Sequence, residues 1–199
     1  MNAKRLETIL AGEFAIGESE MVQRFQKLRD CGLLPVSRGR NAEGMSRDHA
    51  VSGLLSVVSH RPGNAGVTVT MLRGLVPVGG SEASFARAST LAQALRLALA
   101  DEAGLESIVG LRLKDDDAQS NATGRAAIFF LKREMPAVTY YVDGAAAALL
   151  PPGAEQTYDL MDLPTSIFRE TVIAPRLLRR IAGELAPDEA PAPAMAVTP

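Results

Sequence analysis

Apolar positions recur at helical spacing in five segments of the first 102 residues. In each segment, large apolar side chains stand three or four residues apart, and this spacing predicts a helix with one buried face. The second segment carries Met21, Val22, Phe25 and Leu28 on one stripe. The predicted helices cover residues 2–11, 19–30, 46–59, 64–75 and 89–102. The run of Val and Thr over residues 67–70 also fits a strand, so the fourth segment has this alternative.

Capping and turn-forming residues mark the ends of these helices. Ser19 and Ser46 stand where side-chain oxygens cap a first turn. Gly12 and Gly32 are the expected helix terminators. The Gly- and Pro-rich run 76–81 is predicted to be a loop or hinge.

After Leu105 the pattern changes from helical periods to short runs rich in Ile, Val, Phe and Tyr. Such runs, each bounded by turn-forming residues, predict strands over residues 107–113, 125–132, 137–142 and 166–173. The polar stretch 115–124 and the short stretch 133–136 are expected connections, and neighbouring Tyr140 and Tyr141 should face opposite sides of the sheet. Pro175 suits the start of a closing helix that runs to Leu185.

These elements predict an α+β protein with two modules. Residues 1–76 are expected to form a helical helix-turn-helix module that binds DNA, and residues 77–185 an α+β domain for assembly or partner docking. The Pro- and Ala-rich tail 186–199 is expected to be disordered, because it has too few large apolar side chains to build a core.

The charge distribution is uneven along the 199 residues, although the net charge is only −2. Residues 21–80 contain eight basic and three acidic residues, while the rest of the chain is acidic. A basic segment beside an acidic remainder is typical of a DNA-contacting module attached to a partner domain. No apolar run reaches the roughly 20 residues that a membrane helix needs. The single cysteine, Cys31, fits a cytoplasmic protein.

The basic segment contains groups that could contact DNA. We expect the helix over residues 19–30 to expose amide and cationic side chains that suit base edges, and the loop over residues 36–45 to supply arginines for phosphates. The candidate DNA-binding residues are Gln23, Arg24, Gln26, Lys27, Arg38, Arg40, Asn41 and Arg47. Arginines and lysines also occur on ordinary solvated faces, so a surface role without DNA is the alternative for each.

The run LRDCGLLPVSRGRNAEGMSRDHAVSGLLSVV is similar in layout to the winged helix-turn-helix of the MerR family. That resemblance implies a recognition helix over 19–30, a wing over 36–45 and a supporting helix over 46–59. Met45-Ser46 stands where MerR proteins usually carry a Tyr-Arg pair after the wing glycine. The segment also resembles N-terminal regions of regulators from alphaproteobacterial prophages and gene transfer agents, including Gaf-type activators. This second resemblance implies a promoter-binding activator that works beside RNA polymerase and an architectural DNA-bending protein.

Residues with catalytic potential are sparse. His49 is interpreted as an ordinary helix residue, and Cys31 as a small buried residue at a helix end where the dipole does not favour a thiolate. Three consecutive aspartates at 115–117 lack the ligand spacing of a calcium loop and are interpreted as a solvated turn. Spacing of Cys and His for a metal does not occur. We therefore expect a protein that is not an enzyme and needs no cofactor.

The sequence thus favours a DNA-binding transcription regulator, expected to be a homodimer because one short recognition helix reads few base pairs. The partner would be double-stranded DNA, with no membrane. Two alternatives remain: a phage-like packaging adaptor that binds DNA without sequence preference, and a protein-interaction or ligand-sensing module without DNA affinity.

Overall fold

The computed structural model describes residues 1–36, 44–116, 126–131, 138–150 and 168–185. The α-helices are α1 (Ala3–Phe14), α2 (Glu18–Asp30), α3 (Arg47–Ser56), α4 (Ala65–Arg73), α5 (Leu91–Ala100), α6 (Glu102–Ser107), α7 (Gly144–Ala148) and α8 (Pro175–Glu184). The strands are β1 (Val76–Pro77), β2 (Ile108–Asp116), β3 (Ala126–Leu131), β4 (Val138–Val142) and β5 (Phe168–Ile173). Short 3-10 turns cover Pro62–Asn64, Ser81–Ala83 and Phe85–Arg87.

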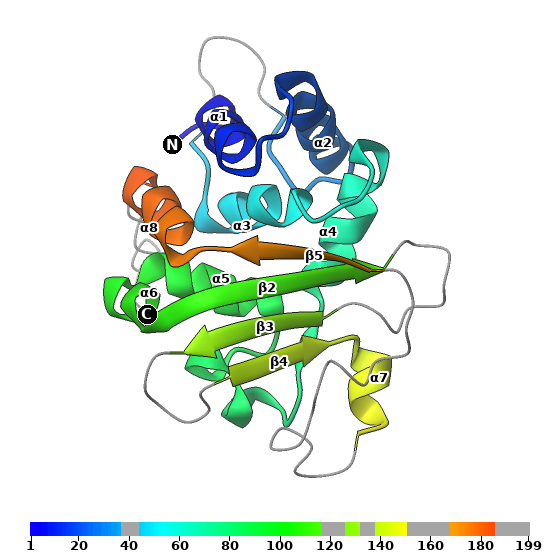
Figure 1. Ribbon diagram of the computed structural model, residues 1–199, viewed down its shortest axis with the longest axis vertical. Helices are drawn as coiled ribbons and strands as arrows, with labels where there is room; N and C mark the ends of the chain where they lie inside the picture. Colours follow the sequence, from blue (N-terminus) through cyan, green and yellow to red (C-terminus); the bar gives the residue numbers. More distant parts are fainter. Residues whose placement is uncertain (37–43, 117–125, 132–137, 151–167, 186–199) are drawn as a thin grey trace, which may run out of the picture.

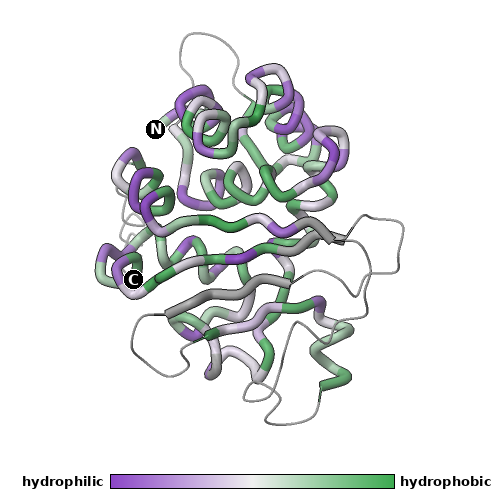
Figure 2. The backbone as a smooth tube through the Cα atoms, in the orientation of Figure 1, coloured by the Kyte–Doolittle hydropathy of each residue, from purple (hydrophilic) through white to green (hydrophobic). Residues whose placement is uncertain are grey.

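The strands form one antiparallel sheet in the order β1-β4-β3-β2-β5, which confirms the predicted α+β class. Figure 1 shows α1 and α2 at the end of the molecule far from the sheet, with α3 and α4 between them and the strands. Helix α5 lies behind the sheet, and α6 and α8 lie side by side at one flank. In Figure 2, the outer helices α1, α2 and α8 alternate polar and apolar residues, as amphipathic helices do.

One large hydrophobic core runs through the described part of the molecule, and a second, small cluster forms around Val78 and Val142. Leu6 of α1, Leu54 of α3, Leu95 of α5, Leu113 of β2 and Ile181 of α8 all belong to one cluster of buried residues. The expected boundary between residues 76 and 77 falls inside β1, which pairs with β4. Buried residues of the helical part and of the sheet therefore belong to the same large core.

The sheet turns one set of alternating side chains toward this core. Leu111 lies opposite Ile173, and both are fully buried. Tyr141 of β4 is also fully buried, whereas Tyr140 packs in a small cluster with Val142, which confirms that the two rings face opposite sides. Burial raises the pKa of the Tyr141 phenol well above its usual value, although Ser84 and the Phe85 backbone oppose this shift.

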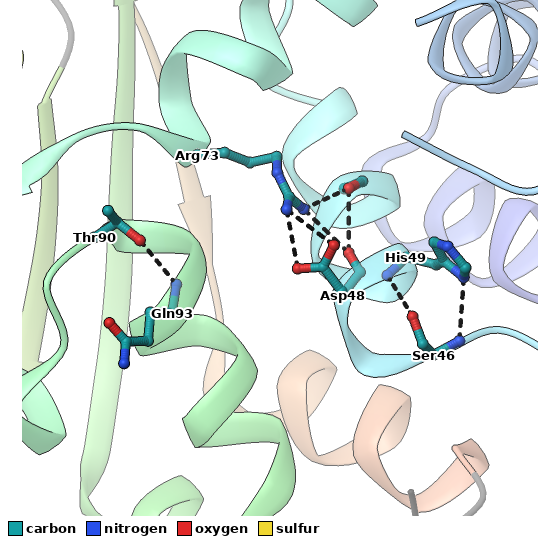
Figure 3. Close-up of polar contacts among 7 residues, drawn as sticks. Ser46, Asp48, His49, Arg73, Thr90 and Gln93 are labelled. Atoms are coloured by element: carbon teal, nitrogen blue, oxygen red, sulfur yellow. Dashed lines mark hydrogen bonds and ion pairs between the residues drawn. The ribbon is translucent and has the colours of Figure 1, made fainter. Parts of the chain in front are cut away.

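The helix ends show why several predicted boundaries hold. After α2, Gly32 adopts a left-handed φ of 68°, and the Leu33 N–H donates to the Leu28 carbonyl at 2.8 Å, as in a Schellman motif. Ser46 caps α3: its Oγ accepts from the His49 N–H at 3.1 Å, and the Ser46 N–H donates to His49 Nδ1 at 3.3 Å. Figure 3 shows this capping box beside the Arg73 guanidinium, which bonds both carboxylate oxygens of Asp48 at 2.9 Å.

Other boundaries differ from the prediction. Gly12 lies inside α1, which continues to Phe14. The run 76–81 contains β1, because long-range pairing with β4 overrides its loop-like composition. The fifth predicted helix is interrupted when Asp101 caps a separate α6. Strand β2 extends through Asp115 and Asp116, and α7 was not foreseen. The connection 133–136 and the tail 186–199 lie outside the described residues.

Candidate nucleic-acid interface

Helices α1 and α2 form a helix-turn-helix with a three-residue turn. The turn consists of Ala15, Ile16 and Gly17, and Ala15 adopts a left-handed φ of 51°. The Ile16 N–H donates to the Ala11 carbonyl at 3.0 Å. Gly17, not Ser19, is the N-cap of α2, so Ser19 lies inside the helix. A turn of three or four residues is the connection found in DNA-binding helix-turn-helix motifs.

Seven residues of α2 are exposed, and the two at its ends, Glu18 and Asp30, are acidic. The other five form the surface that is called the α2 ridge below. It consists of Ser19, Val22, Gln23, Gln26 and Lys27. Val22 was assigned to the buried stripe, and that assignment is wrong, because its side chain is 43% exposed. The buried face of α2 consists of Met21, Arg24, Phe25 and Leu28.

Arg24 does not belong to the α2 ridge, and its predicted DNA contact is wrong. The residue is 1% exposed, and Nη1 donates to the carbonyls of Ser56 at 2.7 Å and Ser59 at 2.9 Å. Nη2 donates to Glu20 Oε1 at 2.5 Å. The guanidinium is held inside the protein because it satisfies carbonyls after the end of α3 that have no partner within that helix.

Gln26 and Lys27 are exposed, and both contact Asp30. The Gln26 amide donates to Oδ1 at 2.9 Å, and Lys27 Nζ lies 3.2 Å from Oδ2. The hydrogen bonds from Gln26 and Lys27 lower the pKa of the Asp30 carboxyl, which favours its ionised form. Because Asp30 neutralises Lys27, this end of the α2 ridge carries no net charge.

Arg47 is not brought to the α2 ridge. It begins α3, and its Nε donates to the Leu99 carbonyl of α5 at 3.2 Å. Ser56, which contacts Arg24, lies at the opposite end of α3, about 15 Å away along a helix of this length. Arg38, Arg40 and Asn41 lie outside the described residues, so their predicted contacts stay predictions.

Among the described residues, four of the basic side chains of residues 21–80 are paired with carboxylates: those of Arg24, Lys27, Arg29 and Arg73. Arg29 lies 3.3 Å from Glu7 of α1, Arg24 contacts Glu20, and Arg73 contacts Asp48. Glu7 and Glu20 precede the basic segment in the chain, so the sequence-level asymmetry is reduced when α1 and α2 pack. Arg61, beside α2 at the start of the turn before α4, is exposed.

The two residues considered for catalysis, His49 and Cys31, lie at helix ends. His49 completes the capping box of α3. Cys31 is exposed, so its predicted burial is wrong; the left-handed turn at Gly32 leaves this C-cap residue at the surface. Among the described residues, no group of three His, Cys, Asp or Glu side chains could hold a metal ion.

The described helices include none with the length and apolar content needed to cross a membrane. Comparisons of the chain with protein-family models, with curated proteins and with solved structures found no match.

Proposed function

We propose that this protein is a DNA-binding transcription regulator that uses α2 as its recognition helix. The observation that carries the proposal is the α2 ridge on the second helix of a three-residue-turn helix-turn-helix. The ridge lies at the end of the molecule far from the sheet, where a DNA duplex would meet α1 and α2 before other elements (Figure 1).

The ridge side chains match the groups of the major groove. The amides of Gln23 and Gln26 suit the paired donor and acceptor of adenine, and the methyl groups of Val22 suit the thymine methyl. Lys27 can bond guanine or a phosphate once it leaves Asp30. This composition favours a half-site that contains A·T pairs.

Phosphate contacts are assigned to the basic loop, through Arg38, Arg40 and Asn41. The protein would act in the cytoplasm as a homodimer, because two recognition helices on a two-fold axis read two half-sites. The resemblance to Gaf-type regulators makes it an activator of prophage-like or gene transfer agent genes, working beside RNA polymerase and a DNA-bending protein.

The test begins with selection of bound duplexes from a random pool, followed by footprinting and by fluorescence anisotropy over a salt series. We expect a defined protected sequence and a loss of affinity with salt. The double variant Arg38→Ala/Arg40→Ala should fold normally and bind DNA at least about tenfold more weakly. Equal affinity of the double variant would remove the loop from the interface.

A matched variant, Asp30→Asn, should act in the opposite direction. It removes one carboxylate and frees Lys27, so the affinity for DNA should rise. The fall of the binding constant with salt concentration should steepen by about one released counterion. If selection yields no consensus while binding stays salt-dependent, the protein is a packaging adaptor without sequence preference, and the regulator proposal fails.

A protein-interaction module is the second candidate function. It is favoured by the neutral state of the described ridge, where Lys27 is paired and Glu18 is exposed nearby. The absence of any DNA binding at low salt, by protein whose circular dichroism shows a folded state, would select this candidate.

A further inference from the structure

A groove of about 320 Å³ lies between α6 and α8, with the end of α5 as its floor. This volume is at the lower end of the range found for small-molecule sites. The apolar floor includes Leu99 and Leu105, both buried. Figure 1 shows α6 and α8 at the flank of the molecule away from α2, so the groove is separate from the α2 ridge.

Opposite charges line the two sides of this groove. Arg179 comes from α8, and Glu102 and Glu106 stand one turn apart on α6. Within the described part of the chain, no ion pair joins Arg179 to either glutamate, whereas the neighbouring Arg176 bonds Glu13 at 2.9 Å. All three residues are exposed, so the groove has a cation on its α8 side and two anions on its α6 side.

We propose that the groove binds a free aliphatic α-amino acid. Its carboxylate would bond the Arg179 guanidinium, and its ammonium would meet Glu102 and Glu106. Its side chain would lie against Ala100, Ala182 and the small exposed parts of Leu99 and Leu105, which are 3% and 5% exposed. Charge-assisted hydrogen bonds at both ends would select a zwitterion over a ligand with one charge. The apolar floor would select an aliphatic side chain over a polar one.

Gly183 gives a way to close the groove without disturbing the fold. It lines the groove, and a Cβ built on it meets no atom within 4 Å. Gly183 is exposed, so Gly183→Leu would add a branched side chain at the mouth of the groove. Gly183→Ala is the matched control, because it supplies a side chain at the same position yet leaves most of the volume free.

The test is isothermal titration of the full-length protein with leucine, valine and methionine, and with serine and glutamate as polar controls. We expect the aliphatic amino acids to bind. N-acetyl-leucine and leucinamide, which lack the ammonium and the carboxylate, should each bind at least about tenfold more weakly. Gly183→Leu and Arg179→Gln should lose leucine binding, while Gly183→Ala keeps it.

Three results would overturn the proposal: no heat with any aliphatic amino acid at millimolar concentration, equal affinity for leucine and its two blocked analogues, or unchanged leucine binding by Gly183→Leu. Thermal unfolding of each variant shows whether lost binding follows from lost folding. Because the groove does not include α2, these results are independent of whether the protein binds DNA.

Discussion

At the scale of single residues, the Arg24 guanidinium fixes the position of α2. Its bonds to the Ser56 and Ser59 carbonyls tie the helix to the end of α3, and Glu20 holds the guanidinium from the same helix. The rotation of α2 about its axis is therefore set, with Gln23 and Lys27 facing outward. Arg24, which was expected to contact DNA, instead orients the exposed side chains of α2.

Replacing Arg24 with Met should lower the free energy of unfolding by about 2–3 kcal/mol. The variant keeps helix propensity and an unbranched, mainly apolar side chain, but it leaves two buried carbonyls without their donor. Lys27→Met, on the exposed side of the same helix, should change stability by only about 0.5 kcal/mol. Urea titrations followed by circular dichroism give both values, and equal midpoints for Arg24→Met and the native chain would contradict this role.

The same residues show where sequence reasoning reached its limit. The spacing of Met21, Phe25 and Leu28 correctly predicted the buried face of α2. Two residues at the edge of that face differ from the prediction: Val22 was expected to be buried and is exposed, and Arg24 was expected to be exposed and is buried. Hydrophobicity alone cannot identify a buried arginine whose partners are carbonyls 32 and 35 residues away. One local signal was present, because Glu20 and Arg24 stand four apart, the spacing of a helical ion pair.

At the scale of elements, the close packing of α4 against α2 depends on Gly66. A Cβ at this position would collide with Cys31 Sγ and would lie 3.0 Å from the Lys27 carbonyl oxygen. The α2 backbone near Lys27 is thus in direct contact with α4, so a displacement of α4 would move α2.

Gly66→Ala should destabilise the protein by about 1–3 kcal/mol, because the added methyl overpacks this contact. Gly12→Ala is the control: it lies in α1, has nothing within 4 Å of its Cβ, and should stabilise by about 0.5 kcal/mol through helix propensity. Calorimetric melting temperatures should therefore shift in opposite directions. A melting temperature for Gly66→Ala at or above that of the native chain would show that the contact tolerates a methyl.

Most elements were predictable because their signals are local. Ser46, Gly32 and Pro175 mark helix ends through caps and backbone geometry, and the structure confirms all three. The two elements that were not predicted are β1 and α7. Strand β1 forms through pairing with β4, which is distant in the sequence, and α7 is a run of glycine and alanine without an apolar stripe.

At the scale of the whole molecule, the continuous core joins the helix-turn-helix to the sheet. Leu75 accepts a hydrogen bond from the Leu91 N–H at 2.9 Å just before β1, so the chain has no free linker at the expected domain boundary. The two-module prediction rested on the Gly- and Pro-rich run 76–81, on the basic character of residues 21–80 and on the strands that begin after Leu105. These local features carry no information about whether the two parts share a core.

The full chain should therefore unfold in one cooperative transition. Far-UV circular dichroism, dominated by helices, and the near-UV tyrosine signal, to which Tyr140 and Tyr141 of the sheet contribute, should give the same urea midpoint. A fragment of residues 1–76 lacks Leu95 and Ile181 from its core and should not unfold cooperatively. Two separated midpoints, or a fragment with a sharp transition, would restore the two-domain organisation.

The shared core also affects how the protein is made. Leu177, Leu178 and Ile181 of α8 complete the core to which Leu6 of α1 belongs, and Arg5 of α1 bonds Glu184 of α8. During synthesis, the N-terminal helices leave the ribosome well before α8, and they remain incompletely packed until residue 184 has emerged. A message truncated before α8 would yield a chain open to chaperones and proteases, so full-length translation is a condition for a folded α1–α2 pair.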